Sequence, residues 1–431
     1  MEFWDIPRFE DFVSGIFSIL GHLKVWRKND ISRVRRMFDL LLVAYLMFFN
    51  VLLIVSEFLD AGNYYDLSSF AAHINPLFLH CLGLFKWSYC ILHHGEIVEL
   101  VKCMENCHNL CKRINLQDIE YQKYKLKLFR CQKNSTLFMN VWFFVAIGGV
   151  MQWCTNPVMY DFYEQYYGGK IIQSSAMRRL PYPGLFPWEI NSISRYIMSF
   201  AFQLWGGIGS TVGVAVFDIL NLTFMMYICV QLDYLKDTLL DKNKEQNYIC
   251  NKIQIYELEE KLKNCIRHHD KILIFLTKLE KFSTGPMFVQ CVGTIIALCL
   301  ISFEASTIQF NGSIEPIMKT IMMFEYWSSI VAELFLYCYI ASKIGDLGTD
   351  VGQAIYASNW EQSYVEYSVD NKSKRKISAI TNIIQFSIMR AQRPILITGG
   401  GFYILCLPTF KALVGLSVSN ALILRQLQED G

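Results

Sequence analysis

The chain has 431 residues, of which 53% are hydrophobic and 18% are charged, and its net charge is +2. With a mean hydropathy of +0.26, this composition excludes a water-soluble globular protein, because folding in water would leave too much apolar surface exposed. The chain is therefore expected to be a membrane protein. No basic stripe suits a nucleic acid.

Seven stretches are long and apolar enough to cross a bilayer, which takes roughly 20 residues per helix. Each crossing is predicted to be helical, because lipid offers backbone amides no hydrogen-bond partners. Residues 1–37 carry Arg and Asp without an apolar core, so no cleavable signal peptide is expected there. In chain order, the predicted spans are residues 38–59, 70–92, 136–157, 193–220, 282–308, 317–341 and 402–424.

Lys and Arg residues are distributed unevenly between the two sides of these spans. Seven precede the first span, and 8, 10 and 7 lie in the second, fourth and sixth connections, which places 32 on one side against 6 on the other. Basic loops stay in the cytoplasm, so the N-terminus is predicted inside and the C-terminus outside. A G-protein-coupled receptor also has seven helices, but its N-terminus lies outside.

The cytoplasmic connections are predicted to be helical. Residues 231–281 place apolar side chains at near-helical spacing between Lys and Glu, so the fourth and fifth spans should continue below the membrane. Residues 344–360 and 376–391 have the same amphipathic pattern. We expect these helices to form a subunit interface around a symmetry axis, since one pore helix per chain encloses a channel only in an oligomer. The alternative, that they pack on themselves, stays open.

The chain is therefore expected to be an all-α membrane protein with four parts. Residues 1–37 form a cytoplasmic segment, and residues 38–341 form a six-helix transmembrane bundle with helical cytoplasmic extensions. Residues 342–401 form cytoplasmic anchor helices, and residues 402–431 form a pore-lining seventh helix with an extracellular tail. A glycine hinge at residues 399–401 should connect the anchor to that last helix.

Several motifs near the end of the chain resemble the insect odorant receptor family. They are the run Met-Arg-Ala-Gln-Arg-Pro at residues 389–394, the glycine break, Phe410, and Leu-Arg-Gln-Leu at residues 424–427. Upstream, Tyr-Cys-Tyr at 337–339 and the segment 354–360 are similar to the family pattern near the sixth span. The chain departs from that pattern at 341–342, where Ala-Ser replaces the usual Gly-Asn, and at Val418 and Asn420, where the family has Ser beside a Tyr.

The resemblance implies an odorant-gated, nonselective cation channel in the plasma membrane of an olfactory sensory neuron. It also implies a heterotetramer with co-receptor subunits, in which this chain is the odorant-tuned subunit, because it lacks the long stretch between the fourth and fifth spans that marks the co-receptor. No enzyme activity, metal or cofactor is expected. Two alternatives stay open: a gustatory-type homotetrameric channel, whose closing pattern is half kept at Ser419, Asn420 and residues 426–427, and a membrane transporter.

A volatile ligand requires an apolar cavity with few polar groups, expected in the outer half of the second, third, fourth and sixth spans. Gln203 and Tyr326 are the expected hydrogen-bond partners of the ligand, and methionines suit a pocket that adapts its shape. The side chains predicted to face the cavity are Phe78, Leu82, Phe85, Ile147, Met151, Cys154, Phe200, Gln203, Leu204, Gly207, Met322, Met323 and Tyr326.

The resemblance places the gate at the outer end of the last helix, on Ile423 and Leu427, which share one helical face. An apolar ring blocks ions by dewetting, and Ser419 and Gln426 would supply polar groups when the helix moves. The nearby Arg425 is expected to extend toward headgroups or a neighbouring subunit.

Charges inside spans are costly, so Lys86 and Glu333, at similar depth, are predicted to form a structural ion pair. Asp218 is instead expected near a helix end, where it would be hydrated. Among four Asn-x-Ser/Thr sequons, Asn311 falls on the outer side and is the candidate glycosylation site.

Overall fold

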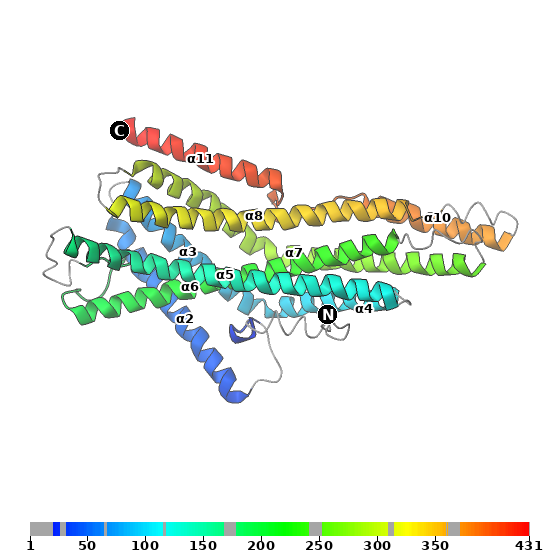
Figure 1. Cartoon of the computed structure of the whole chain (residues 1–431), viewed down its shortest axis with the longest axis horizontal. Helices are drawn as coiled ribbons and strands as arrows, with labels where there is room; N and C mark the ends of the chain where they lie inside the picture. The colour runs from blue at the N-terminus through cyan, green and yellow to red at the C-terminus, as the bar shows by residue number, and fades with distance from the viewer. Residues whose placement is uncertain are drawn as a thin grey trace.

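The computed structural model describes residues 20–25, 32–63, 67–114, 118–167, 178–240, 252–308, 314–358, 360 and 371–430. These residues form a long bundle of helices with one short hairpin, which confirms the predicted all-α class (Figure 1). The regular elements are α2 (Arg33–Asp60), η1 (Ala61–Asn63), α3 (Leu67–Leu92), α4 (His94–Ile114), α5 (Asp118–Tyr166), α6 (Ile193–Leu239), α7 (Lys252–Thr307), α8 (Ile314–Tyr356), α10 (Asn371–Ala391), β1 (Thr398–Gly399), β2 (Tyr403–Ile404) and α11 (Leu407–Asp430).

Helix α6 forms the centre of the bundle and packs against α2, α3, α5, α7 and α8. It is apolar around most of its circumference, which is typical of a helix with neighbours on every side. Glycines let two backbones approach closely here, since a Cβ on Gly83 of α3 or Gly213 of α6 would overlap the other helix's backbone. Gly206 and Gly209 make the same kind of contact with α2.

Four of the helices, α2, α5, α6 and α7, are long and apolar enough to cross a membrane, and Leu407–Ile423 is a shorter apolar helix. The other two predicted spans coincide with α3 and α8, which carry buried polar groups such as His80, Lys86 and Glu333 and are therefore less apolar. The seven-span topology stays a prediction.

The predicted cytoplasmic extensions of the spans are confirmed as helices. Helix α6 continues to Leu239, α7 begins at Lys252, α8 continues to Tyr356, and α10 covers Asn371–Ala391. Together with α4 and the first part of α5, these segments form the anchor module, at the right of Figure 1. Much of the largest hydrophobic core lies in this module, which supports the interpretation that these helices pack on themselves.

A buried polar network crosses the anchor module. The Gln231 side chain donates to the Tyr124 hydroxyl (3.1 Å) and accepts from His268 Nε2 (2.9 Å) and the Cys111 thiol (3.3 Å). His268 lies well before the predicted fifth span, which starts at residue 282, and its side chain is fully buried. Burial lowers the pKa of His268 to about 3, so its imidazole is neutral in the folded protein.

The structure corrects the predicted start of the last helix. Residues 398–399 and 403–404 pair as an antiparallel hairpin, and Gly400 and Gly401 form its turn with φ values of 66° and 74°, which disfavour residues with a Cβ. The predicted glycine hinge is the turn of this hairpin, and Tyr403 donates to the Met287 carbonyl (3.2 Å), which connects the hairpin to α7. Helix α11 begins only at Leu407, because Pro408, which lacks an N–H, fits the first turn of a helix.

Candidate functional site

An apolar cavity lies between α3, α5, α6 and α8, the four helices from which the sequence predicts it. Its volume is about 150 Å³, below the ~300–1,000 Å³ of most ligand sites, so it suits a small ligand. We call it the aromatic cavity. It is lined by Pro76, Leu79, Trp142, Val145, Ala146, Gly149, Val150, Trp153, Tyr182, Thr211, Val214, Ala215, Met322, Glu325, Tyr326, Ser329, Ile330 and Glu333.

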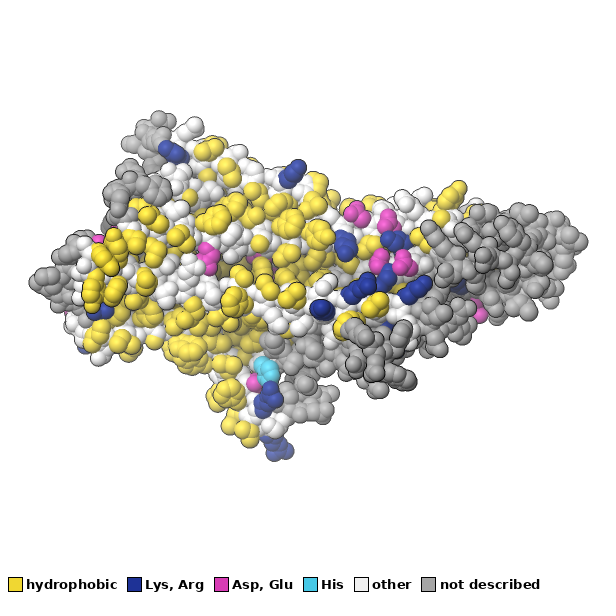
Figure 2. Space-filling view, in the orientation of Figure 1, with side chains coloured by type: hydrophobic (Ala, Val, Ile, Leu, Met, Phe, Trp, Pro, Cys, Tyr) yellow, Lys and Arg dark blue, Asp and Glu magenta, His cyan; other side chains and the backbone are white. Residues whose placement is uncertain are grey.

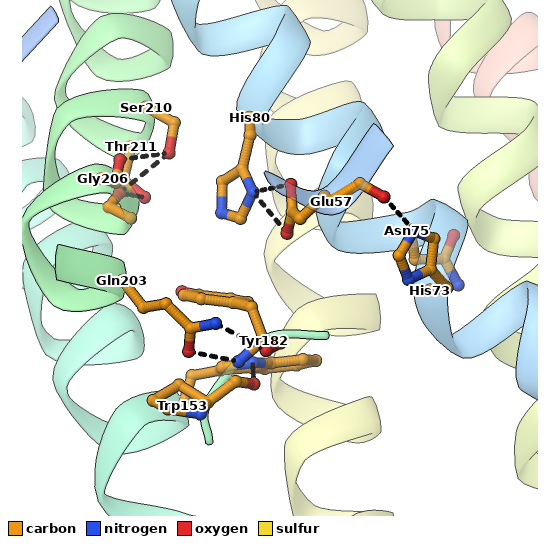
Figure 3. A network of polar contacts seen from close by, with 12 residues as sticks. Glu57, His73, Asn75, His80, Trp153, Tyr182, Gln203, Gly206, Ser210 and Thr211 are labelled. Atoms are coloured by element: carbon orange, nitrogen blue, oxygen red, sulfur yellow. Dashed lines mark hydrogen bonds and ion pairs between the residues drawn. The ribbon is translucent and has the colours of Figure 1, made fainter. Parts of the chain in front are cut away.

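One wall of the cavity consists of stacked aromatic rings. Tyr182 comes from the segment between α5 and α6, and its ring stacks on Trp153 of α5 with centroids 6.2 Å apart. Trp153 also meets the ring of Tyr326 of α8 edge to face (6.3 Å), and its indole N–H donates to the Pro181 carbonyl (3.1 Å). Tyr182, which comes from a non-helical segment, therefore contributes to the wall of a cavity otherwise formed by helices, and Figure 3 shows it beside Trp153.

Gln203 of α6 holds Tyr182 in place. Its side-chain amide donates to the Tyr182 carbonyl (2.7 Å), and its side-chain carbonyl accepts from the Tyr182 backbone N–H (3.0 Å), as Figure 3 shows. The Gln203 side chain is fully buried and does not line the cavity. The expectation that Gln203 binds the ligand is therefore corrected, because its amide is engaged by backbone groups that would otherwise be buried without partners.

A buried hydrogen-bonded pair of side chains lies beside the Tyr182 ring. His80 Nδ1 of α3 lies 2.8 Å from Glu57 Oε2 of α2, and both side chains are buried. The His80 ring meets the Tyr182 ring edge to face, with centroids 4.7 Å apart (Figure 3). His73 donates to the Glu57 backbone carbonyl (2.9 Å). These contacts connect α2, α3 and the Tyr182 segment.

A group of buried charges lies at one end of the cavity, where Glu333 contributes to the lining. Lys86 Nζ of α3 lies 3.2 Å from Glu333 Oε1 of α8, as the sequence predicts, and 2.7 Å from Asp218 Oδ1 of α6. We call these three residues the charge cluster. Tyr337 donates to Asp218 (2.9 Å), and Gln290 of α7 donates to Glu333.

The expectation of a hydrated Asp218 is wrong. Helix α6 continues for another 21 residues to Leu239, so Asp218 lies in the middle of the bundle with 0% exposure. The charge cluster thus joins α3, α6, α7 and α8 through hydrogen-bonded charges. One lysine faces two carboxylates here, so its removal would leave two buried acids without a cation.

Of the side chains predicted to face the cavity, Met322 and Tyr326 line it. Phe85, Ile147 and Met151 point outward instead, with 38%, 40% and 45% exposure. The other predicted residues also lie outside the lining, in packed or partly buried positions between helices: Phe78, Leu82, Cys154, Phe200, Gln203, Leu204, Gly207 and Met323.

The sequence predicts the correct helices but the wrong faces of α3 and α5. On α6 the lining residues Thr211 and Val214 continue the predicted face of Gly207 one and two turns further along the helix. On α5 the lining follows Trp142, Ala146, Gly149 and Trp153, a helical stripe next to the predicted one. A span that is apolar on several sides carries no signal for its rotation, so periodicity does not identify the face that lines a cavity.

Tyr182 lies outside every predicted span, and reasoning from spans therefore missed it. The one available signal was its position between Pro181 and Pro183, since two prolines restrict the backbone around an aromatic side chain.

The predicted gate residues lie on α11, at the edge of the bundle in Figure 1. Ser419, Ile423 and Gln426 are exposed, and Ile423 exposes 53% of its surface. Ala421 on the opposite face packs against Ala71 and Phe303. Leu427 lies within α11, but its side chain is outside the described part of the chain, and Asn311 lies outside the described residues altogether.

Residues 66–418 match the family model described as 7tm Odorant receptor. The chain is 25% identical over 284 residues to Odorant receptor 13a of Drosophila melanogaster, covering 65% of this chain and 64% of that protein. It is 25% identical over 162 residues to Odorant receptor 10 of Aedes albopictus, covering 38% of each. The chain thus spans less than two thirds of the length of these curated relatives.

Among solved structures, the chain is similar to the insect olfactory receptor OR5 from Machilis hrabei in complex with eugenol. The two share 14% sequence identity and a TM-score of 0.71, over 99% of this chain and 100% of that one. At this identity the likeness shows a common fold.

Proposed function

The chain belongs to the odorant receptor family, and from that premise we propose that it is the odorant-tuned subunit of a ligand-gated, nonselective cation channel. The family is one of membrane receptors and not of enzymes. The observation that supports a ligand-binding role is the aromatic cavity between four helices, to whose wall Tyr182 contributes.

The chemistry of the cavity indicates the class of ligand. Its walls are largely aromatic and aliphatic, and Thr211 and Tyr326 are among its few hydroxyl groups. Apolar walls bind by excluding water and by shape, and one or two polar groups fix the orientation. We propose a small volatile hydrophobic compound with at most one hydrogen-bonding group. The Machilis hrabei receptor of the same fold was solved with eugenol.

Helix α11 supports the pore function. It packs mainly on α7 and α8, and its other face exposes Leu416, Ile423, Ser419 and Gln426. An exposed apolar face on a membrane helix suits assembly of several chains around a pore. We propose a heterotetramer with co-receptor subunits, in which Ile423 and Leu427 form the gate and Ser419 and Gln426 face the conducting path.

Helix α8 connects the cavity to the pore helix. Met322 and Tyr326 of α8 line the aromatic cavity. Further along α8, the Ser342 hydroxyl accepts from the Leu407 N–H at the start of α11 (3.1 Å), and the Phe335 and Phe410 rings lie 5.5 Å apart. A ligand that binds better to one position of α8 would therefore shift α11 between closed and open positions.

The membrane arrangement completes the proposal. The N-terminus is cytoplasmic, the C-terminus is extracellular, and the chain resides in the plasma membrane of an olfactory sensory neuron, with Asn311 as the glycosylation site. Helix α8 runs through the predicted boundary at residues 341–342 without a break. We therefore propose that the four predicted parts of the chain are layers relative to the membrane and not separately folded domains.

Electrical recording tests this function. The chain is expressed with and without a co-receptor subunit, and cation current is recorded against volatile esters, terpenoids and alcohols. We expect odorant-evoked current only with the co-receptor. Current from the chain alone would favour the homotetrameric, gustatory-type alternative, and ligand uptake without conductance would favour a transporter.

A further inference from the structure

A second hollow lies between α5, α6 and α8, with a volume of about 580 Å³. It shares no lining residue with the aromatic cavity. Figure 2 shows hydrophobic side chains over the middle of the molecule and a group of Lys, Arg, Asp and Glu side chains beyond them, toward the anchor module. The hollow contains both kinds of side chain, and we call it the basic groove.

The two ends of the basic groove differ in chemistry. One end is apolar and is formed by Phe138, Leu222, Met226, Leu336 and Ile340. The other end carries charged and polar side chains, Lys127, Arg130, Asn134, Asp233 and Lys343. A ligand that fills the groove must therefore be apolar at one end and anionic at the other.

The acidic residues near the groove already have partners. Lys127 Nζ lies 2.5 Å from Asp233 Oδ2 and 2.6 Å from Asp237 Oδ2. Lys236 lies 3.3 Å from Asp350 and 3.7 Å from Asp233. These two lysines and three aspartates form a nearly closed ion-pair network.

Two further basic residues lie outside this network. Arg130 of α5 and Lys343 of α8 are exposed, and within the described part of the chain neither has an acidic partner. Lys343 lines the groove together with Arg130 and with the thiols of Cys131 and Cys229. The groove therefore presents two basic side chains without an acidic partner among the described residues beside an apolar channel, and together with the neighbouring network of two lysines and three aspartates its basic end carries a net charge of +1.

We propose that the basic groove binds one anionic phospholipid, with its headgroup phosphate on Arg130 and Lys343. Its acyl chain would lie along Phe138, Leu222 and Leu336. Arg presents a planar set of donors that suits phosphate oxygens, and Lys adds a point charge. Basic pockets between membrane helices on the cytoplasmic side recognise anionic headgroups in this way. A free phosphate would engage the basic end but leave the apolar end uncovered.

Lipid retention by the purified receptor complex tests the proposal. The complex is reconstituted in phosphatidylcholine containing phosphatidylserine, extracted, and its bound lipids are counted by native mass spectrometry. We expect one tightly retained phosphatidylserine per chain. Removal of both charges in the double variant Arg130→Gln/Lys343→Gln should weaken retention about 30-fold, since each basic residue near the headgroup contributes about one factor of five.

Two further variants make the test specific. Lys133→Gln removes the same charge from a nearby exposed position of α5 outside the groove, and it should retain lipid as the wild type does. Leu336→Trp fills the apolar end without changing charge, and it should release the lipid while the complex keeps its mass and melting temperature.

Three results would overturn the proposal. The double variant and Lys133→Gln could retain equal amounts of lipid. Inorganic phosphate could displace phosphatidylserine as well as a short-chain phosphatidylserine does, which would mean an anion site without an acyl chain. The wild type could retain no lipid while the double variant changes the number of subunits. That result would mean that the groove is a contact between chains.

Discussion

Tyr182 forms part of the aromatic cavity although it belongs to no helix. Gln203 fixes its backbone with two hydrogen bonds, and Trp153 stacks on its ring. The position of one side chain thus depends on α5, α6 and the connecting segment together. At this scale, small changes of volume should decide which ligand fits, because packed interiors tolerate an added side chain poorly.

Substitution of Ala146 by Trp should weaken the odorant response. Ala146 lines the cavity, so the indole would occupy the ligand's space and raise the half-maximal odorant concentration by about tenfold or more. Ile147→Trp is the matched control, because Ile147 is the next residue on α5, points outward and is 40% exposed. Dose–response currents measure both. An equal loss in the two variants would place the ligand outside the aromatic cavity.

His268 should make stability fall with acidity. The pKa of His268 is lowered to about 3 by burial, so the unfolded chain binds a proton below about pH 6.5 while the folded chain does not. The contribution of neutral His268 to the free energy of unfolding is fully present above the unfolded pKa. It is lost as pH falls toward 3, by up to about 1.4 kcal/mol per pH unit. His269, whose pKa is lowered to about 4, acts in the same direction.

Melting temperatures of the purified receptor between pH 7 and pH 4 test this effect. His268→Gln keeps a group that can donate to Gln231, and it should flatten the curve, with the part due to His269 left. If the melting temperature of His268→Gln depends on pH as that of the wild type does, His268 is protonated or solvated in the folded protein.

Helices in this bundle are held by two kinds of contact, glycine crossings and buried charges. Gly213 of α6 meets the backbone of α3 at Gly83, and the charge cluster joins α3, α6 and α8 nearby. Neither contact is visible in hydropathy, yet both fix how the helices are rotated against each other.

Gly213→Ala should destabilise the bundle, because a Cβ there would overlap the Gly83 carbonyl and push α3 from α6. A cost of about 1–3 kcal/mol is typical of overpacking and would lower the melting temperature by several degrees. Gly148→Ala on α5 is the control, since nothing lies within 4 Å of its added Cβ, and it should keep or raise the melting temperature. Equal melting temperatures for the two variants would contradict the close crossing.

Lys86→Met should reduce surface expression strongly. It leaves Asp218 and Glu333 as buried acids without a cation, and breaking a buried pair costs about 3–5 kcal/mol. Adding Asp218→Asn removes one of the two acids and should restore part of the expression. If Lys86→Met leaves both surface expression and gating as in the wild type, the charge cluster has no structural importance.

For the whole molecule, the direction of insertion decides which end of α11 meets the exterior. The charge distribution predicts an outer C-terminus, with 32 basic residues on the inner side against 6 on the outer. An epitope fused after residue 431 should bind antibody on intact, unpermeabilised cells, and one fused before residue 1 should bind only after permeabilisation. The reverse pattern would exclude α11 as a pore helix gated at its outer end.

The sequence by itself determined that this is a membrane protein, that its fold is all-α, and which family it resembles. Apolar runs of membrane length require helices, because lipid satisfies no backbone amide. The amphipathic spacing in residues 231–281 correctly predicts that α6 and α7 continue as helices beyond the predicted spans. The pairing of Lys86 with Glu333 followed from their equal depth and the cost of a lone buried charge.

Tertiary structure alone decided which faces of the helices meet. Periodicity does not distinguish between the possible rotations of a span that is apolar on several sides. Ile147 and Met151, which the sequence predicts to face the cavity, therefore lie on the exposed surface of the bundle. Close glycine contacts and hydrogen bonds between distant segments, such as that of Gln203 with Tyr182, select one rotation. These contacts join residues far apart in the chain, and local patterns do not contain that information.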